Sequence, residues 1–209
     1  FFSGLKIVLP DQKPIEVDPT YTRARFQLAQ DLLRLGNEDV GWEVARLAAE
    51  QDEYNVVASN LMRLRERIKG FSVLEANGIQ VRMDSMEASI YGPAVMELLS
   101  EAKETLCQKY DVTPGAPIVV EIFPEQKDFA IRTFGLPGGT GFLGVCFGRV
   151  ITANSPASQG ERPSNWQSVL WHEFCHVVTL EKTRNRMPRW LSEGISVYEE
   201  RQRNDAWGE

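Results

Sequence analysis

The only two histidines of the chain lie four residues apart, in the sequence His-Glu-Phe-Cys-His at 172–176. Residues four apart on an α-helix lie on the same face, so the imidazoles of His172 and His176 can reach one metal ion. The surrounding segment from Asn165 to Leu180 is mostly apolar and predicts one helix. Burying two imidazoles and a carboxylate in such a helix is costly unless they are paired or metal-bound. The pattern therefore favours a helix-borne metal site over two unrelated histidines.

A third metal ligand is expected downstream, because catalytic zinc sites usually have three protein ligands and leave the fourth position to water. Residues 181–187 form a Lys/Arg/Asn-rich loop, after which Pro188 predicts the first position of a second helix. A connection of this length lets the second helix return across the first, which would direct Glu193 at the two histidines. Glu173 is next to the first histidine, where metallohydrolases use a carboxylate to take the proton of a metal-held water.

The two segments together resemble a known family. His-Glu-x-x-His followed by Trp-Leu-x-Glu-Gly-x-x-x-Tyr is similar to the gluzincin metallopeptidases, and more narrowly to the peptidase-MA-like families, whose second motif reads Pro-x-Trp-Leu-x-Glu-Gly. The resemblance covers residues 166–200 and extends back to about residue 71, where the upstream sheet of the family is expected. It implies that His172, His176 and Glu193 hold one Zn²⁺ ion, that Glu173 is the general base, and that the substrate is a peptide or protein.

The end of the second motif adds two weaker candidates. Tyr198 and Glu200 match the aromatic and acidic positions of the family motif, and are candidates for supporting the metal ligands or the transition state. The alternatives are that Tyr198 packs in the core and that the Glu199-Glu200 pair is a solvated helix face. Gluzincins stabilise the oxyanion with a Tyr or His after the third ligand. Here that residue is missing, upstream, or beyond Glu209.

Two further features bear on the kind of activity. The Gly-x-Met-Glu-Asn sequence with which gluzincin aminopeptidases hold a substrate amino terminus is absent, so an endopeptidase is favoured over an aminopeptidase. The alternative from another class is a catalytically weak or inactive peptidase-like binding or scaffold module that acts through its helical N-terminal part. An intact Glu173 argues against that alternative, because a purely structural zinc site needs no base. Because the chain starts at Phe1 rather than Met, we expect it to be a piece of a longer protein.

Hydrophobic periodicity divides the chain in two. Residues 1–69 are predicted to be a helical segment, strongly so from Thr20 to Lys69, with spacings similar to one degenerate tetratricopeptide repeat. The alternative is a helical hairpin packed on the second part, and either arrangement offers a surface for a protein partner. Residues 70–209 are predicted to be the gluzincin-like domain. The expected fold class is α+β, with a helical N-terminal segment followed by a zincin-like domain that has a small mixed sheet and an active-site helix.

Within the second part, the pattern predicts alternating strands and helices. Strands are expected at 79–83 and 117–123, and one or two more at 145–153. Helices are expected from Pro93 to Tyr110 and over 125–134.

The sequence Gly-Thr-Gly-Phe-Leu-Gly at 139–144 fits the dinucleotide-binding pattern Gly-x-Gly-x-x-Gly. Its context excludes that interpretation, because the run leads into a strand-like segment and not into a helix. We interpret it as a flexible loop beside an edge strand. The family resemblance places such a strand along the substrate cleft, where Val145, Cys146 and Phe147 would contact a bound peptide.

Composition excludes several other functions. The formal net charge is −6, which gives no support for nucleic-acid binding, and no apolar run is long enough to span a membrane. The three cysteines are an odd number without the spacing of a disulfide framework, so we interpret them as buried thiols. Cys175 is an unsuitable metal ligand, because it lies about 100° around the helix from His176.

Overall fold

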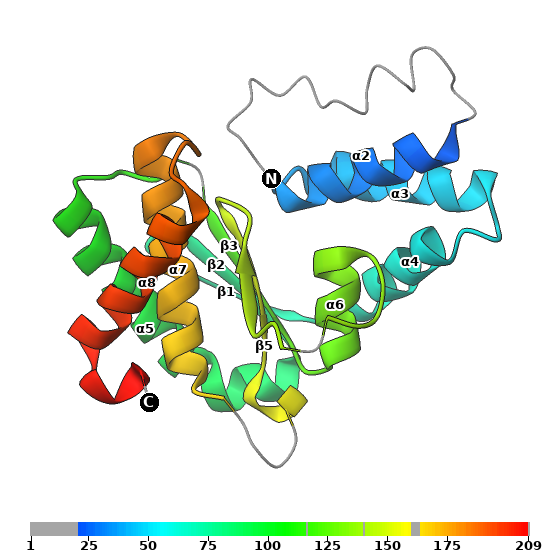
Figure 1. The fold of residues 1–209 in the computed structure, drawn as a ribbon. Helices are drawn as coiled ribbons and strands as arrows, with labels where there is room; N and C mark the ends of the chain where they lie inside the picture. The colour runs from blue at the N-terminus through cyan, green and yellow to red at the C-terminus, as the bar shows by residue number, and fades with distance from the viewer. Residues whose placement is uncertain (1–20, 116, 140, 160–163, 209) are drawn as a thin grey trace.

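The segments predicted as strands form a single mixed sheet. The computed structural model describes residues 21–115, 117–139, 141–159 and 164–208 (Figure 1). Its strands are β1 (Ser72–Ala76), β2 (Ile79–Met83), β3 (Ile118–Phe123), β4 (Gly144–Cys146) and β5 (Val150–Asn154). Their order in the sheet is β1-β2-β3-β5-β4. The predicted strands are confirmed, whereas β1 was not predicted. The predicted combination of helices with a small mixed sheet is confirmed.

The sheet has a parallel centre and antiparallel edges. Strands β2, β3 and β5 are parallel, while β1 and β4 pair with their neighbours in the antiparallel sense. All six residues of β3 are buried, as expected for a strand at the centre of a sheet covered on both faces, and its one charged residue is Glu121. The glycine-rich run leads into β4 and not into a helix, so the context that excluded dinucleotide binding is confirmed.

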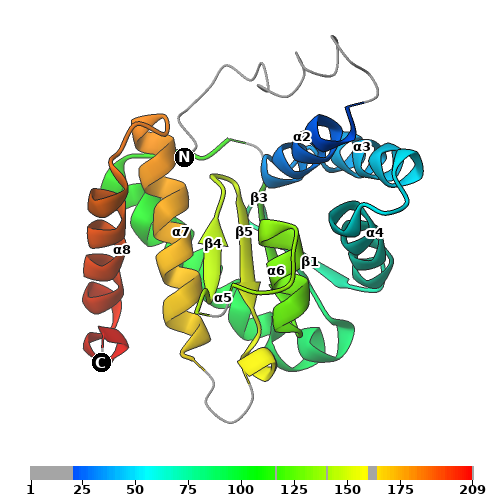
Figure 2. The same cartoon turned by 45° about the vertical axis from the view of Figure 1, so that its right-hand side comes forward.

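Helices cover both faces of the sheet (Figures 1 and 2). Helices α5 (Ser85–Tyr110) and α7 (Trp166–Thr183) cover one face, and α8 (Arg189–Arg203) packs outside α7. Helix α6 (Gln126–Phe134) lies on the other face, together with α2 (Thr22–Arg34), α3 (Glu38–Gln51) and α4 (Val56–Ile68). Among the described residues, none of the helices is long and apolar enough to cross a membrane.

The prediction that a helix begins at Pro93 is wrong, because α5 begins eight residues earlier, at Ser85. The carboxylate of Asp84 accepts hydrogen bonds from the backbone N–H groups of Met86 (2.9 Å) and Glu87 (3.2 Å), which satisfies two donors of the first turn. Pro93 therefore lies inside the helix, where it removes one intrahelical hydrogen bond. The apolar side of this long helix is buried against the sheet, and that burial outweighs the missing bond.

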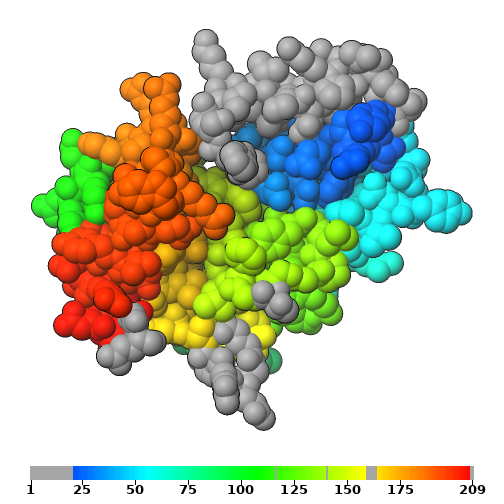
Figure 3. Space-filling view, viewed as in Figure 1, coloured from blue at the N-terminus to red at the C-terminus, as the bar shows by residue number. Residues whose placement is uncertain are grey.

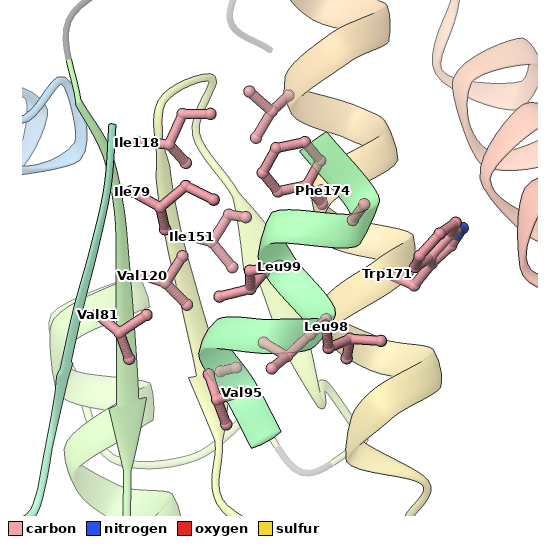
Figure 4. Packing of buried hydrophobic residues seen from close by; sticks show 14 of the residues in the cluster. Ile79, Val81, Val95, Leu98, Leu99, Ile118, Val120, Ile151, Trp171 and Phe174 are labelled. Carbon is pink, nitrogen blue, oxygen red and sulfur yellow. The ribbon is translucent and has the colours of Figure 1, made fainter. Parts of the chain in front are cut away.

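The first core cluster fixes α5 and α7 to the sheet. Figure 4 shows side chains of α5, from Val95 to Leu99, lying against apolar side chains of β2, β3 and β5. Helix α7 contributes Trp171 and Phe174, both fully buried. Phe174 immediately follows the His172-Glu173 pair, so the packing of this aromatic ring sets where the polar residues of α7 point.

The second core cluster joins the N-terminal helices to the other face of the sheet. Apolar residues of α2, α3 and α4 share this cluster with Phe123 of β3, Phe129 of α6 and Val145 of β4. A buried ion pair lies on the same face, between Arg132 Nε and Glu121 Oε2 at 2.7 Å. The helical prediction for residues 20–69 is confirmed for the part that the structure describes, whereas residues 1–20 lie outside it. The division at residue 69 and the likeness to a tetratricopeptide repeat stay predictions.

Candidate metal centre

Two packed helices carry the candidate metal ligands. Helix α7 starts after Asn165, whose side-chain oxygen accepts hydrogen bonds from the N–H groups of Gln167 and Ser168. It ends at a turn in which Arg184 and Asn185 both have positive φ, and α8 follows after Pro188, which is the capping residue and not the first helical residue. This tight turn returns α8 along α7 (Figure 1), as the sequence predicted.

The three predicted ligands converge. Oε2 of Glu193 lies 3.2 Å from Nε2 of His172 and 3.5 Å from Nε2 of His176. One ligand atom from each of the three residues lies within 4.8 Å of the others, which could hold a metal ion. The two imidazole rings stand edge to face, with centroids 4.7 Å apart, and the Nε2 atom of each ring lies near Oε2 of Glu193.

These separations fit a small tetrahedral ion. Zinc binds imidazole nitrogen and carboxylate oxygen at about 2.0–2.2 Å, which places two ligand atoms of a tetrahedral site roughly 3.3–3.5 Å apart. The two distances to Glu193 Oε2 match that value. Two imidazoles and one carboxylate are also a donor set that suits zinc, and three protein ligands leave a fourth position for water or substrate.

The nitrogen of each histidine that faces away from Glu193 has its own partner. Nδ1 of His172 lies 2.5 Å from Oε1 of Glu200, and the other oxygen of Glu200 accepts a hydrogen bond from the Ser168 hydroxyl. Nδ1 of His176 lies 2.8 Å from the Ser192 hydroxyl and 3.3 Å from that of Ser196. Partners of this kind keep the ring orientation and leave Nε2 unprotonated for a metal.

Glu173 does not belong to the ligand group, because its side chain lies between α7 and β4. The N–H of Cys146 donates a hydrogen bond to the Glu173 carboxylate. Gly144 makes this approach possible, since a Cβ at residue 144 would lie 2.8 Å from Glu173 Cγ and 2.9 Å from Val169 Cγ1. The sequence analysis missed this role and treated Gly144 as part of a flexible loop.

Burial controls the protonation of the site. It raises the pKa of Glu173 to about 7, with Glu193 and Glu200 acting in the same direction and His172 opposing them. It lowers the pKa of His176 to about 4, and the charge of His172 adds to this effect. A neutral imidazole is the form that binds a metal, and a carboxyl group with a pKa near neutrality can both accept and return a proton.

The pKa values of the two remaining ligands, His172 and Glu193, are shifted by their neighbours. Burial alone would lower the pKa of His172, but the hydrogen bond to Glu200 and the charge of Glu173 outweigh it and raise the pKa. Burial likewise tends to raise the pKa of Glu193, but His176 and a hydrogen bond from Arg189 outweigh it and lower the pKa. Glu193 is therefore held in the ionised form that a metal requires.

Three residues at the end of the motif differ in their placement. Glu200 reaches the site through His172, whereas Tyr198 is 52% exposed and its ring lies beside the Lys109 ammonium group, away from the ligands. The interpretation of Glu199 and Glu200 as a solvated pair is wrong. Glu199 is 2% exposed, and it accepts hydrogen bonds from Tyr110 Oη (2.5 Å) and Lys109 Nζ (2.9 Å).

The predicted edge strand lies directly beside α7 (Figure 2). β4 ends at Cys146, so Phe147 lies one residue beyond it, although its N–H still bonds to the Val150 carbonyl at 2.8 Å. Antiparallel pairing directs the backbone groups of Val145 to β5 and those of Gly144 and Cys146 to the unpaired side. On that side, the Cys146 N–H bonds to Glu173.

Comparison of the chain with models of known protein families, with curated proteins and with solved structures found no match.

Proposed function

We propose that the protein is a zinc-dependent peptidase, with endopeptidase activity favoured over aminopeptidase activity. The observation that carries this proposal is the convergence of the His172, His176 and Glu193 donor atoms beside a buried carboxylate, Glu173. A structural zinc site needs no such carboxylate. A buried carboxyl group that had no function would only lower the stability of the fold, because burial makes its ionisation unfavourable.

In this proposal the chain supplies the proton transfers and the alignment. Zinc, when bound, polarises a carbonyl group and lowers the pKa of water toward roughly 7. Glu173 accepts a proton as the water oxygen bonds to the peptide carbon and the π electrons move to the carbonyl oxygen. When the carbon–nitrogen bond breaks, Glu173 returns the proton to the leaving amine. The outward-facing backbone groups of Gly144 and the carbonyl of Cys146 align an extended peptide along β4 by strand addition.

The test combines metal content with peptide cleavage. Elemental analysis is made on the full chain purified without chelator, for wild type, Glu173→Gln and Glu193→Ala, with Glu181→Ala as a control for an exposed glutamate of α7. We expect about one equivalent of zinc in wild type, Glu173→Gln and Glu181→Ala, and a loss of zinc in Glu193→Ala. Cleavage of a mixed peptide library should be seen with wild type and Glu181→Ala and be lost in Glu173→Gln.

Two results would contradict the proposal. Zinc that is absent from wild type, or that does not depend on Glu193, removes the metal site. Zinc that binds as expected while no peptide is cleaved removes the peptidase activity and favours the scaffold alternative.

A further inference from the structure

The proposed reaction needs a group that stabilises negative charge on the carbonyl oxygen. Among the described residues after Glu193, the one tyrosine is Tyr198, which is 52% exposed and lies with its ring beside the Lys109 ammonium group. The first residue of α8, Arg189, lies beside one of the three candidate ligands. Its Nε donates a hydrogen bond to Oε1 of Glu193 at 3.2 Å, while Oε2 of the same carboxylate faces both histidines. The guanidinium group is therefore one carboxylate width away from the three metal-binding atoms.

The contact with Glu193 has little value as a simple salt bridge. The Arg189 side chain is 84% exposed, and exposed ion pairs contribute little stability because water screens them. The order along the helix is also the less favourable one, since an acidic residue preferably comes before its basic partner at i,i+4. Stability therefore does not explain why an arginine stands here.

The guanidinium has donors beyond the one that bonds to Glu193. Arginine carries five N–H donors in a rigid fork, and the described contact uses Nε. The Arg189 side chain is largely exposed, and α8 forms part of the molecular surface in the space-filling view (Figure 3). A planar cation with several donors suits a developing oxyanion better than a single hydroxyl does.

The two tyrosines of this region contact other residues. Tyr198 lies beside Lys109, and the hydroxyl of Tyr110 is bonded to Glu199. We propose that Arg189 is a catalytic residue that stabilises the oxyanion of the tetrahedral intermediate. This inference rests on the proposed peptidase function. It places the stabilising group inside the second motif, four residues before Glu193, and so agrees with the upstream alternative of the sequence analysis.

The experiment uses the zinc-loaded full chain and a probe that does not depend on knowing the substrate. Phenylphosphonate carries a tetrahedral oxyanion, and its binding is measured by calorimetry for wild type, Arg189→Gln and Arg189→Lys. Arg186→Gln is the matched control, because Arg186 is an exposed arginine of the same turn. Zinc affinity is measured for each variant by competition with a chelating dye.

We expect Arg189→Gln to weaken phenylphosphonate binding at least about tenfold and to leave the zinc affinity within about twofold of wild type. The phenylphosphonate affinity of Arg189→Lys should lie between those of wild type and Arg189→Gln, because lysine keeps the positive charge but lacks the planar set of donors. Arg186→Gln should match wild type. With a cleaved peptide in hand, kcat of Arg189→Gln should fall by about 10²-fold while KM changes by less than about threefold.

The inference would be overturned if Arg189→Gln lowered the zinc affinity and left phenylphosphonate binding unchanged. If Arg189 only orients Glu193, the substitution lowers zinc affinity by about 10–100-fold and leaves phenylphosphonate binding to the saturated protein unchanged. If wild type takes up no zinc, the proposed function fails and the inference falls with it. If wild type cleaves peptides and Arg189→Gln is as active as Arg186→Gln, the inference alone fails.

Discussion

Replacing Gly144 by alanine tests how closely β4 must approach Glu173. The added Cβ would lie 2.8 Å from Glu173 Cγ and 3.0 Å from Glu173 Oε1. Ordinary contacts begin at 3.4 Å, so the Glu173 side chain has to move by about 0.6 Å or β4 has to move away from α7. Either movement weakens the hydrogen bond between the Cys146 N–H and the carboxylate.

Gly144→Ala is expected to lower kcat and to leave the zinc content unchanged. A displacement of about 1 Å in a catalytic group lowers rates by up to about 10²-fold, so we expect kcat of Gly144→Ala to fall between roughly tenfold and 10²-fold. Crowding of this kind also destabilises a protein by about 1–3 kcal/mol. Zinc content should equal that of wild type, because the crowded atoms belong to Glu173 and Val169 and not to the ligands.

The assay compares kcat at saturating zinc with zinc content and with the urea midpoint of unfolding. Gly115→Ala is the control, since a Cβ at residue 115 meets nothing within 4 Å. One possible result is that the Gly144→Ala protein is folded and zinc-loaded and has a kcat within twofold of wild type. That result would show that the position of β4 does not set the position of Glu173. The role assigned to Gly144 would then be wrong.

Three further predictions concern the residues around the ligands. Glu200→Gln weakens the partner of His172 and should lower zinc affinity by about 10–100-fold in a chelator competition, whereas Glu199→Gln, whose partners are Lys109 and Tyr110, should not. In the metal-free protein, the pKa of Glu173 is about 7 against an ordinary 4.5, so the folded state holds the proton more tightly and stability is lost as the pH rises through 7. At pH 8, the unfolding free energy of metal-free Glu173→Gln should therefore exceed that of metal-free wild type by up to about 3 kcal/mol. The difference is measured by urea unfolding at several pH values. A difference that does not shrink toward pH 4.5 would contradict this prediction. Asn165→Ala removes the cap of α7 and should cost about 1 kcal/mol in the same measurement, with no change if the cap is dispensable.

The parts of the site that follow from local spacing were predictable. His172 and His176 share a helix face because they are four residues apart, and Glu193 reaches them because the turn between the helices is short. The strands at 79–83 and 118–123 were equally visible, since apolar alternation or a continuous apolar run marks them. Each of these signals lies within one or two neighbouring elements.

The features that the sequence did not reveal depend on contacts between distant segments. Gly144 matters only because β4 packs against α7, and nothing local separates a glycine that allows a close approach from one in a flexible loop. Ser192 and Ser196 flank Glu193 on the face of α8 that meets His176, and their small polar side chains on that face were an available signal. The early start of α5 was missed because Pro93 was given more weight than the cap at Asp84.

The alternation of side chains along β4 couples the two sides of the molecule. Val145 belongs to the cluster with α2, α3, α4 and α6, whereas Cys146 packs in the cluster with α5 and α7. Val145 and Cys146 are consecutive, so the helical cluster and the Cys146 N–H that holds Glu173 meet at neighbouring residues of a three-residue strand. Loosening the helices, for example by Leu61→Ala, should therefore speed hydrogen exchange at the Cys146 amide. An unchanged exchange rate would show that β5 alone holds the strand. If the rate does rise, the packing of the N-terminal helices helps to fix the position of Glu173. A partner that binds those helices would then affect Glu173 without contacting the site.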